Sequence, residues 1–381
     1  LPVTPGERER ITHWLALAAA PAVGPRTVAQ LIERFGSAAG ARSAGRDALS
    51  EAGLSAAAIA ALQTPDRELI QNSLAWAEQE SASILTPEDP AYPTQLTTLD
   101  APPPVLYLRG DSALLAEPQI AMVGSRNPTP GGIDTSREFA RYLAGLGLVI
   151  TSGLAIGIDG AAHTGALESG RTIAVLGTGP DRVYPAAHRD LARRIAERGA
   201  LLTEFPPGTG PQASHFPRRN RLISGLSLGT LVVEAAPRSG SLITARYATE
   251  QGREVFAIPG SIHNPLARGC HELIRQGAKL VDSADQVLEE ISPQLRRFMA
   301  EPPSVGDHGV ATSPPTASAA VADPEYRQLL DCMGHDPLAP DQLIARSGLS
   351  AQAVSSMLLL LELQGHVSSH PGGRYSLCGG R

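Results

Sequence analysis

Residues 148–163 read LVITSGLAIGIDGAAH, and this stretch decides the fold. It opens as a short apolar run rich in β-branched residues, passes through a loop of serine and glycine, and continues as a helix. Similar apolar runs recur along the chain, at 119–123, 148–151, 172–176, 200–203, 230–235, 254–258 and 278–281. Helical stretches such as 133–146 and 159–168 lie between most of them. Short strands separated by helices predict right-handed crossovers and a mostly parallel sheet.

The predicted fold class is therefore α/β, with an extended Rossmann-like, doubly wound sheet over residues 84–292. The near-continuous apolar character of the strands indicates burial on both faces. Residues 1–83 are rich in alanine and leucine and predict a module of short helices. Its turn at 21–25, which opens the next helix, is typical of a helix–hairpin–helix or SAM-like module, whose glycine turn can offer N–H groups to a phosphate. An ordinary helical hairpin fits the same spacing.

The last part of the chain changes character. Residues 293–321 are rich in proline, alanine, serine and threonine, and predict a flexible linker. Residues 322–381 predict three helices followed by two short strands that flank the turn at 371–373. Three helices and a two-stranded wing are the pattern of a winged helix.

Composition excludes several classes of protein. The 381 residues carry 32 basic and 38 acidic side chains, a net charge of −6, which argues against histone-like coating of nucleic acid but permits a local basic groove. The apolar fraction of 42% excludes wholesale disorder. The three cysteines lie far apart, which predicts neither a metal cluster nor a disulfide framework and suits a reducing cytosol. No apolar stretch approaches the ~20 residues that span a bilayer, so no membrane association is expected.

Glycine, in most cases with serine, follows four of the predicted strands. Ligands of open parallel sheets lie beyond the carboxyl ends of the strands. Glycine permits close approach of the backbone, serine adds a hydroxyl donor, and each helix N-terminus adds N–H groups. Four such loops on one edge predict an anionic ligand; they are residues 124–126, 152–160, 177–179 and 237–241.

Residues 215–225 read HFPRRNRLISG and contain three arginines, with no acid between residues 206 and 233. Beside a glycine-lined sheet edge, an arginine cluster is a phosphate clamp. Phe216 is a candidate for stacking on a base, typically worth ~1–3 kcal/mol. The alternative is a solvated helix start with a core phenylalanine. Four strand ends span on the order of 15 Å, which suits an extended strand with several phosphates.

Other chemistries find weaker support in the sequence. The dinucleotide fingerprint, a Walker A motif and a hydrolase elbow are absent, so neither a catalytic residue nor a cofactor is expected. Asp159 and His163 share a helix face at i, i+4. Helix capping and a structural histidine account for them better than a metal site, which needs further ligands. Glu204 and Glu234 end strands and are expected to orient arginines or backbone donors.

Four segments resemble the DNA-processing protein A family, also called DprA or Smf: 124–126, 152–159, 216–225 and 239–245. The resemblance is specific over about 85–290 and continues through Pro259-Gly260 and 269–278. It implies an extended Rossmann-like domain that binds single-stranded DNA. By matching position, the residues that would line the DNA groove are Ser125, Arg126, Gly153, Phe216, Arg219, Asn220, Arg221, Ser239, Gly240 and Ser241. Arg218 is added on charge alone.

The resemblance also implies a role. Family members are non-enzymatic and cytoplasmic, form homodimers, and load the recombinase RecA onto incoming DNA in natural transformation. They protect the incoming DNA and act where single-strand-binding protein would otherwise occupy it, which makes that protein a further candidate partner. The sequence departs from some relatives, which carry a cation at Ile156 and at Thr164 and often asparagine at His188.

Two other functions remain open at this stage. The first is a Rossmann-type nucleotide-processing enzyme, such as a phosphoribohydrolase, which would need Glu204 or Glu234 in the pocket. The second is a scaffold in which the winged helix carries the DNA or partner contact. The last predicted helix, 351–364, contains no lysine or arginine, so it is not expected to recognise duplex DNA strongly.

Overall fold

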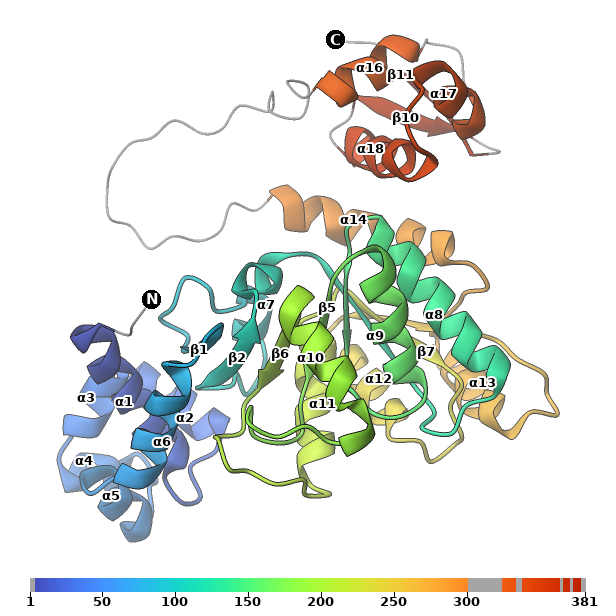
Figure 1. Ribbon diagram of the computed structural model, residues 1–381. Coiled ribbons are helices and arrows are strands. Elements are labelled where there is room, and N and C mark those ends of the chain that lie inside the picture. Colours follow the sequence, from blue (N-terminus) through green and yellow to red (C-terminus); the bar gives the residue numbers. More distant parts are fainter. Residues whose placement is uncertain (1–3, 301–323, 334–337, 364–365, 371–372, 378–381) are drawn as a thin grey trace. The chain divides into compact units, whose positions relative to one another are not determined.

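The computed structural model describes residues 4–300, 324–333, 338–363, 366–370 and 373–377. The chain divides into two compact units, with the main division after Ser292. Figure 1 gives the elements of each unit in order along the chain. In the described residues no helix is long and apolar enough to cross a membrane.

The N-terminal module of the first unit consists of helices, as predicted. They are α1 (Pro5–Ala19), α2 (Pro25–Phe35), α3 (Ala38–Ser43), α4 (Arg46–Glu51), α5 (Ala56–Gln63) and α6 (Arg67–Ala77). A capping box between Thr4 and Glu7 starts α1. The predicted turn joins α1 to α2, which begins with a proline at its first position. Trp14 and Trp76 are buried in the apolar core of the module.

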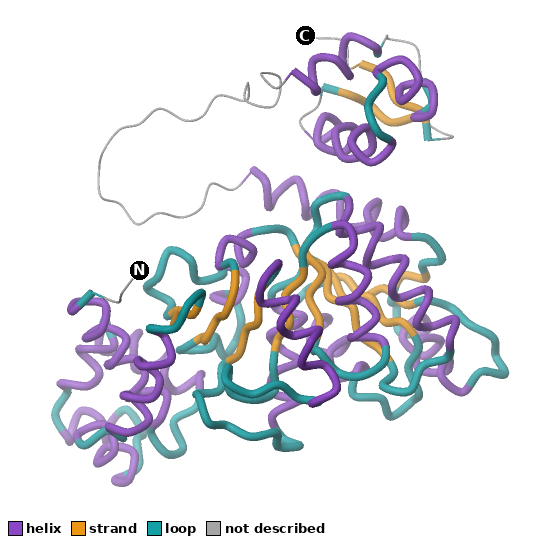
Figure 2. The backbone as a smooth tube through the Cα atoms, in the orientation of Figure 1, coloured by secondary structure: helices purple, strands orange, loops and turns teal. Residues whose placement is uncertain are grey.

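A sheet of nine strands follows, in the order β1-β2-β6-β5-β4-β3-β7-β8-β9. The strands are β1 (Ala82–Leu85), β2 (Leu106–Gly110), β3 (Gln119–Gly124), β4 (Val149–Ser152), β5 (Thr172–Val175), β6 (Ala200–Thr203), β7 (Gly229–Val233), β8 (Glu254–Ala257) and β9 (Lys279–Leu280). The pairings from β6 across to β9 are all parallel. The seven predicted strands are therefore confirmed, and so is the mostly parallel sheet (Figure 2).

Two further strands, β1 and β2, were not predicted from the sequence. These two strands extend the sheet with antiparallel pairings, β1 to β2 and β2 to β6. The boundary predicted between residues 83 and 84 cuts through β1. A four-residue strand that directly follows a helical module, with no crossover helix to mark it, carries little of the βαβ pattern from which the other strands were predicted.

Helices cover both faces of the sheet. They are α7 (Thr94–Thr97), α8 (Pro130–Gly145), α9 (Ile158–Ser169), α10 (Arg189–Arg198), α11 (His215–Gly225), α12 (Ser241–Glu250), α13 (Arg268–Arg275) and α14 (Ala284–Ala300), with short 3-10 turns at Ser112–Ala116, Ala186–His188 and Pro265–Ala267. Apolar residues of α9 and α10 pack on one face of the sheet, and those of α11 and α12 on the other. In Figure 1, α8, α9 and α10 lie in front of the strands. This arrangement is the doubly wound architecture expected.

The second unit has the predicted winged-helix elements. They are α16 (Pro324–Cys332), α17 (Pro340–Ser347), α18 (Ala351–Leu363), β10 (Val367–His370) and β11 (Arg374–Leu377). The two strands pair antiparallel, and Leu329, Leu343 and Leu358 are buried in the core between the helices. Helix α14 continues to Ala300, so residues 293–300, which the sequence suggested as linker, are helical. The remaining predicted linker, 301–321, lies outside the described residues.

Candidate nucleic-acid interface

A groove of about 660 Å³ opens beyond the carboxyl ends of β3, β4 and β7. The chain runs from β3 to β4 on one side and returns to β7 on the other side of β3. The groove therefore lies at the topological switch point, where open α/β sheets bind their ligands. The first turns of α11 and α12 complete its wall.

The structure brings together most of the residues predicted for DNA binding. Those that line the groove are Ser125, Arg126, Phe216, Arg219, Asn220, Ser239, Gly240 and Ser241. Gly153 lines an adjoining hollow of about 80 Å³, which shares Arg126, Phe216 and Arg219 with the groove. Arg218 and Arg221 line neither of these spaces in the described part of the chain.

Arg126 and Phe216 form the centre of the groove wall. The exposed Arg126 guanidinium lies over the Phe216 ring, 5.5 Å from its centroid. The centroid of the Tyr184 ring lies 5.6 Å from that of Phe216, and Tyr184 is 48% exposed. A guanidinium over an aromatic face is a cation–π pair that also leaves N–H donors available for a phosphate.

Arg219 has a different position from the one expected. Its side chain is buried, and its Nη1 donates to the carbonyl oxygens of Gly153, at 2.6 Å, and Val175. Burial lowers the pKa of Arg219 to about 10. A Cβ atom added to Gly153 would lie 2.6 Å from the guanidinium, which explains the glycine there. Arg219 thus forms the floor of the groove and fixes the loop after β4, instead of standing free as a phosphate clamp.

Arg218 and Arg221 point to another part of the molecule, which corrects the prediction of one three-arginine clamp. Both donate to Oε2 of Glu204, at 2.9 and 2.7 Å, and Arg221 also donates to the carbonyl oxygen of Ala101. The physical reason is helical periodicity: positions i and i+3 share a face of α11, whereas position i+1 is turned away from it. The arginines of α11 are therefore close in sequence but contact different regions of the molecule.

Glu234 holds the loop that carries Arg126. It follows β7 with a φ of 53°, in the left-handed region that non-glycine residues seldom adopt. Its backbone oxygen accepts the Ser125 N–H at 2.7 Å, and its carboxylate accepts the backbone N–H and the hydroxyl of Thr129 at 2.8 and 2.6 Å. The expectation that Glu204 and Glu234 orient arginines and backbone donors is confirmed by these contacts, and neither residue lines the groove.

The start of α12 supplies polar groups on the opposite wall. The hydroxyls of Ser239 and Ser241 lie 2.7 Å apart, and Asn220 donates to the carbonyl oxygen of Gly240 at 3.3 Å. The sequence analysis left the exposed Arg238 out of the predicted site, although it stands in the same loop and lines the groove. The signal that could have found it is its place one residue before the Ser-Gly-Ser turn at a helix N-terminus.

The predicted glycine loop at 177–179 packs against residues of the site. A Cβ atom on Gly177 would lie 2.8 Å from the Phe216 ring, so this glycine makes room for the ring. Gly179 similarly lies against the backbone of Pro206. The loop at 177–179 is not part of the lining of the groove. Three strand ends, not four, therefore face the ligand space.

Asp159 and His163 are structural, as expected, although Asp159 does not cap a helix. Its carboxylate accepts the backbone N–H groups of Gly153 and Ala155 at 3.1 and 3.3 Å, and burial raises its pKa. His163 is buried, with Nδ1 2.7 Å from the Thr172 hydroxyl, and burial lowers its pKa to about 3. Within the described ranges, no three His, Cys, Asp or Glu side chains are grouped to hold a metal ion.

The family model of DNA recombination-mediator protein A matches residues 83–292, which include every strand from β2 to β9 and the whole groove. This chain belongs to that family. The model of the DprA winged helix domain matches residues 313–373. The two family models thus match the α/β part of the first unit and the winged helix of the second.

Curated relatives extend the match over most of the chain. Protein Smf of Escherichia coli strain K12 is 44% identical over 309 residues, covering 81% of this chain and 80% of the relative. Protein Smf of a Synechocystis strain is 37% identical over 390 residues, covering 95% and 98%. The DNA processing protein DprA of Streptococcus pneumoniae is 48% identical over 213 residues, covering 55% and 73%.

Solved structures of the family agree with the fold. DNA processing protein A of Streptococcus pneumoniae has a TM-score of 0.65 at 36% identity and covers 76% of this chain and 99% of its own. DNA processing protein A of Helicobacter pylori, whose structure was described for its single-stranded DNA binding mode, has a TM-score of 0.52 at 31% identity, with coverage of 56% and 96%.

Three positions singled out in the sequence, Ile156, Thr164 and His188, have defined surroundings in the structure. Ile156 is 42% exposed and lines the hollow beside Phe216. The Thr164 hydroxyl donates to the carbonyl oxygen of Gly160. His188 lies 2.9 Å from the carbonyl oxygen of Leu154 through Nδ1 and packs against Gly160. His188 thus supports the loop after β4.

Proposed function

We propose that this protein is a single-stranded DNA-binding mediator of recombination, which protects incoming DNA and loads the recombinase RecA during natural transformation. It acts by binding and not by catalysis. The observation that carries the proposal is the groove at the switch point, where Arg126, Arg238 and the N-terminus of α12 face one continuous space.

The extent of the groove favours a strand over a single nucleotide. Its wall is built from the ends of three adjacent strands, β4, β3 and β7, which span roughly 10 Å. The hollow beside Tyr184 continues it past Phe216. The two glutamates that a phosphoribohydrolase would need are bonded elsewhere, to Arg218 and Arg221 and to the Thr129 loop. The single-stranded DNA binding described for the Helicobacter relative supports the same ligand.

The mechanism of binding is electrostatic. Arg126, Arg238 and the N–H groups at the start of α12 hold phosphates, while the Phe216 ring offers a face on which any base can stack. Backbone contacts of this kind leave the base edges unread. Affinity is therefore expected to tolerate sequence and to fall as salt rises.

Binding to the backbone leaves the bases of a held strand free for a recombinase to pair. In the proposed role, a homodimer presents the strand to RecA and keeps it accessible where single-strand-binding protein would cover it, in the cytoplasm of the cell. The family resemblance motivates these partners. Light scattering of the purified protein measures the dimer, and RecA filament formation on strands already covered by single-strand-binding protein measures the loading.

The binding experiment compares three ligands at two salt concentrations by fluorescence anisotropy. A labelled single strand of mixed sequence is titrated with the full chain, and matched duplex and mononucleotide serve as competitors. We expect the single strand to bind most tightly and the affinity to fall by at least about tenfold between 50 and 200 mM salt. Tighter binding of the mononucleotide, or its turnover, would reject a strand-binding role in favour of an enzyme.

A further inference from the structure

Glu234 occupies a strained backbone position directly after β7. Its φ of 53° lies in the left-handed region, which a glycine adopts without cost. Other residues persist there only where the surrounding structure holds them, and such positions cluster at functional sites. A glutamate in this conformation therefore directs attention to what its side chain does.

Glu234 holds both ends of the loop that carries Arg126. The loop runs from Ser125, at the end of β3, to Thr129, just before α8. Its first residue donates its N–H to the backbone oxygen of Glu234 at 2.7 Å. Its last residue donates its N–H and its hydroxyl to the Glu234 carboxylate at 2.8 and 2.6 Å. The exposed Arg126 thus lies between two attachments to one residue.

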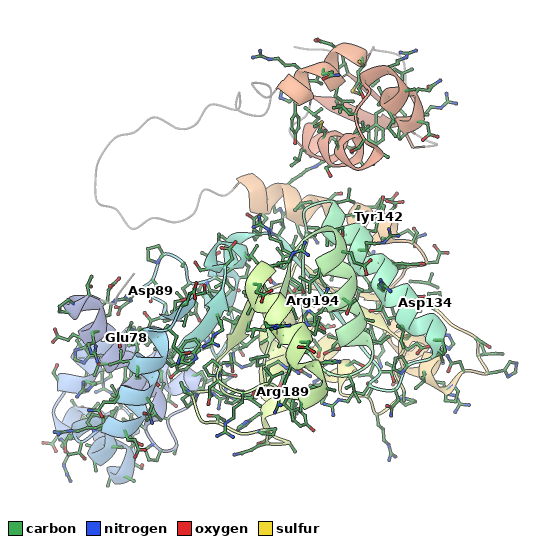
Figure 3. The ribbon with its side chains drawn as sticks, viewed as in Figure 1. Glu78, Asp89, Asp134, Tyr142, Arg189 and Arg194 are labelled. Atoms are coloured by element: carbon green, nitrogen blue, oxygen red, sulfur yellow. The ribbon has the colours of Figure 1, made fainter. Side chains whose placement is uncertain are left out.

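The carboxylate fits a space that a glycine of α8 leaves open. Helix α8 follows the loop directly, and Figure 3 marks Asp134 near the start of this helix and Tyr142 near its end. A Cβ atom added to Gly132 would lie 2.5 Å from Oε2 of Glu234. The N–H of Gly132 also donates to the Thr129 hydroxyl at 3.0 Å. The first turn of the helix therefore helps to determine where the carboxylate lies.

The same residue links the loop to the one that follows β8. Asn264 donates to Oε1 of Glu234 at 3.4 Å. The next residue, Ala235, donates its N–H to the carbonyl oxygen of Leu266 at 2.6 Å. Arg238 stands three residues further along and lines the groove. The two exposed arginines of the groove therefore stand on loops that meet at Glu234.

We infer that Glu234 is a positioning residue for DNA, which holds Arg126 where its guanidinium contacts a phosphate. This inference rests on the proposed function of the groove. A loop that is ordered before the strand arrives loses less conformational freedom on binding, and this raises the affinity. Glu234 itself lies outside the lining of the groove, so it acts through the loop.

The charge of Glu234 alone predicts the opposite effect. A carboxylate close to a phosphate-binding groove repels the strand, so its removal should strengthen binding if it had no other role. Positioning predicts that its removal weakens binding, because the loop is released. The sign of the change in affinity therefore separates the two explanations.

The first pair of variants displaces the carboxylate without changing Glu234 or the net charge. Gly132→Ala places a methyl group against the flexible end of the glutamate side chain, which can move while the helix folds. Gly131→Ala is the matched control, because the nearest atom to its added Cβ, the Thr129 hydroxyl oxygen, lies 3.8 Å away. In anisotropy titrations of a labelled single strand, we expect Gly132→Ala to weaken binding about fivefold and Gly131→Ala to change it less than twofold.

The second pair changes the side chain itself. Glu234→Gly removes the carboxylate and adopts the φ of 53° without strain, so this variant is expected to fold. Glu234→Gln removes the charge but keeps an oxygen for the Thr129 N–H, and its amide can donate to the Thr129 hydroxyl. We expect about fivefold weaker binding for the glycine variant, and unchanged or tighter binding for the glutamine variant. Combined with Arg126→Ala, the glycine variant should cost less than about twofold more.

Hydrogen–deuterium exchange of residues 125–132 without DNA gives a readout that does not depend on strand binding. Exchange should be faster in Glu234→Gly and Gly132→Ala, and should equal that of the unaltered protein in Glu234→Gln and Gly131→Ala. If the unaltered protein bound no strand, the proposed function would fail, while faster exchange in the first two variants would still support the hold of Glu234 on the loop. Unchanged exchange in both of them, tighter strand binding by Glu234→Gly, or an equal loss of affinity when Arg126 is already absent would overturn the inference.

Discussion

Arg219 in the floor of the groove and Arg126 on its rim carry the same guanidinium group in opposite surroundings. We use groove floor for Arg219 and Asp159, and groove rim for Arg126 and Arg238. Arg219 is 4% exposed and bonded to backbone carbonyls, whereas Arg126 is exposed and touches only an aromatic ring face among the contacts described above. The floor residues are expected to determine stability, and the rim residues to determine the affinity for DNA.

The largest expected effect concerns the groove floor. Arg219→Ala would leave the buried Asp159 without its nearest cation and free two carbonyl oxygens, so we expect a loss of about 3 kcal/mol in the free energy of unfolding. Urea denaturation followed by circular dichroism measures it. Arg219→Lys is expected to restore less than half, because one ammonium cannot reproduce the planar fork.

An unchanged unfolding midpoint for Arg219→Ala would contradict this division of roles. If that variant folded normally and lost only its affinity for DNA, Arg219 would belong with the rim. The groove floor and the groove rim would then differ in burial but not in their role.

A second effect comes from His163 of α9, whose ring is buried. Its pKa is about 3 in the folded protein and about 6.5 in the unfolded chain, so the unfolded state takes up the proton first. Stability is therefore complete above pH 6.5 and falls as the pH drops below it. At pH 5, about 1.5 units lower, we expect a loss of roughly 2 kcal/mol in the free energy of unfolding.

Urea denaturation at pH 7 and pH 5 measures the effect, and His163→Gln serves as the comparison because it removes the titrating group. The pH dependence of the variant should be smaller by the amount assigned to His163. Equal pH dependence in both proteins would place the loss of stability elsewhere, for example in carboxylates.

The third effect belongs to the groove rim. Arg126→Ala removes one exposed phosphate contact, so the affinity for a single strand should fall by about tenfold at low salt, equivalent to ~1.4 kcal/mol. The slope of log affinity against log salt should fall by about 0.7. Anisotropy titrations with strands of unrelated sequence measure both.

Arg137→Ala is the matched control for Arg126. Arg137 is an exposed arginine of α8 that pairs with Glu168, away from the groove lining. Its replacement should leave both affinity and salt slope within error. A similar loss in both variants would mean that general surface charge, and not the rim, binds the strand.

The smallest effect is expected for Arg218→Ala. Glu204 keeps its bond to Arg221, and Arg218 itself is half-exposed, so stability should change by about 0–1 kcal/mol. Single-strand affinity for a thymidylate strand should change less than twofold, because Arg218 does not line the groove. A tenfold loss of affinity in that titration would place Arg218 among the residues that contact DNA.

The parallel core of the fold could be predicted because its signal is local. Each central strand is an apolar run followed by a glycine loop and a helix, so sequence position gives spatial position at the carboxyl edge. The antiparallel strands β1 and β2 lack this signal, since they pair with each other over a separation of more than twenty residues. Their partners are set by tertiary packing and not by any nearby pattern.

The candidate site shows the same limit at the level of side chains. One cluster in the sequence contains Arg218, Arg219 and Arg221. In the structure the periodicity of α11 directs Arg218 and Arg221 to Glu204, and Arg219 to the groove floor. Arg219 is buried and Arg126 is exposed, and neither composition nor spacing in the sequence distinguishes the two. Arg238 was missed because a single exposed arginine in a loop carries no pattern of its own.

The junction between the helical module and the sheet has a practical consequence for anyone who wishes to isolate the α/β part. Tyr107 in β2, Val105 just before it and Ile84 in β1 belong to the same apolar core as Trp14 and Trp76. A cut at residue 83, where the family match begins, would expose these apolar side chains to solvent and would divide β1 at its second residue. Protease-resistant fragments should therefore retain residues 4–292 as one piece, and boundaries for crystallisation are better drawn before Pro5 than at the start of the family match.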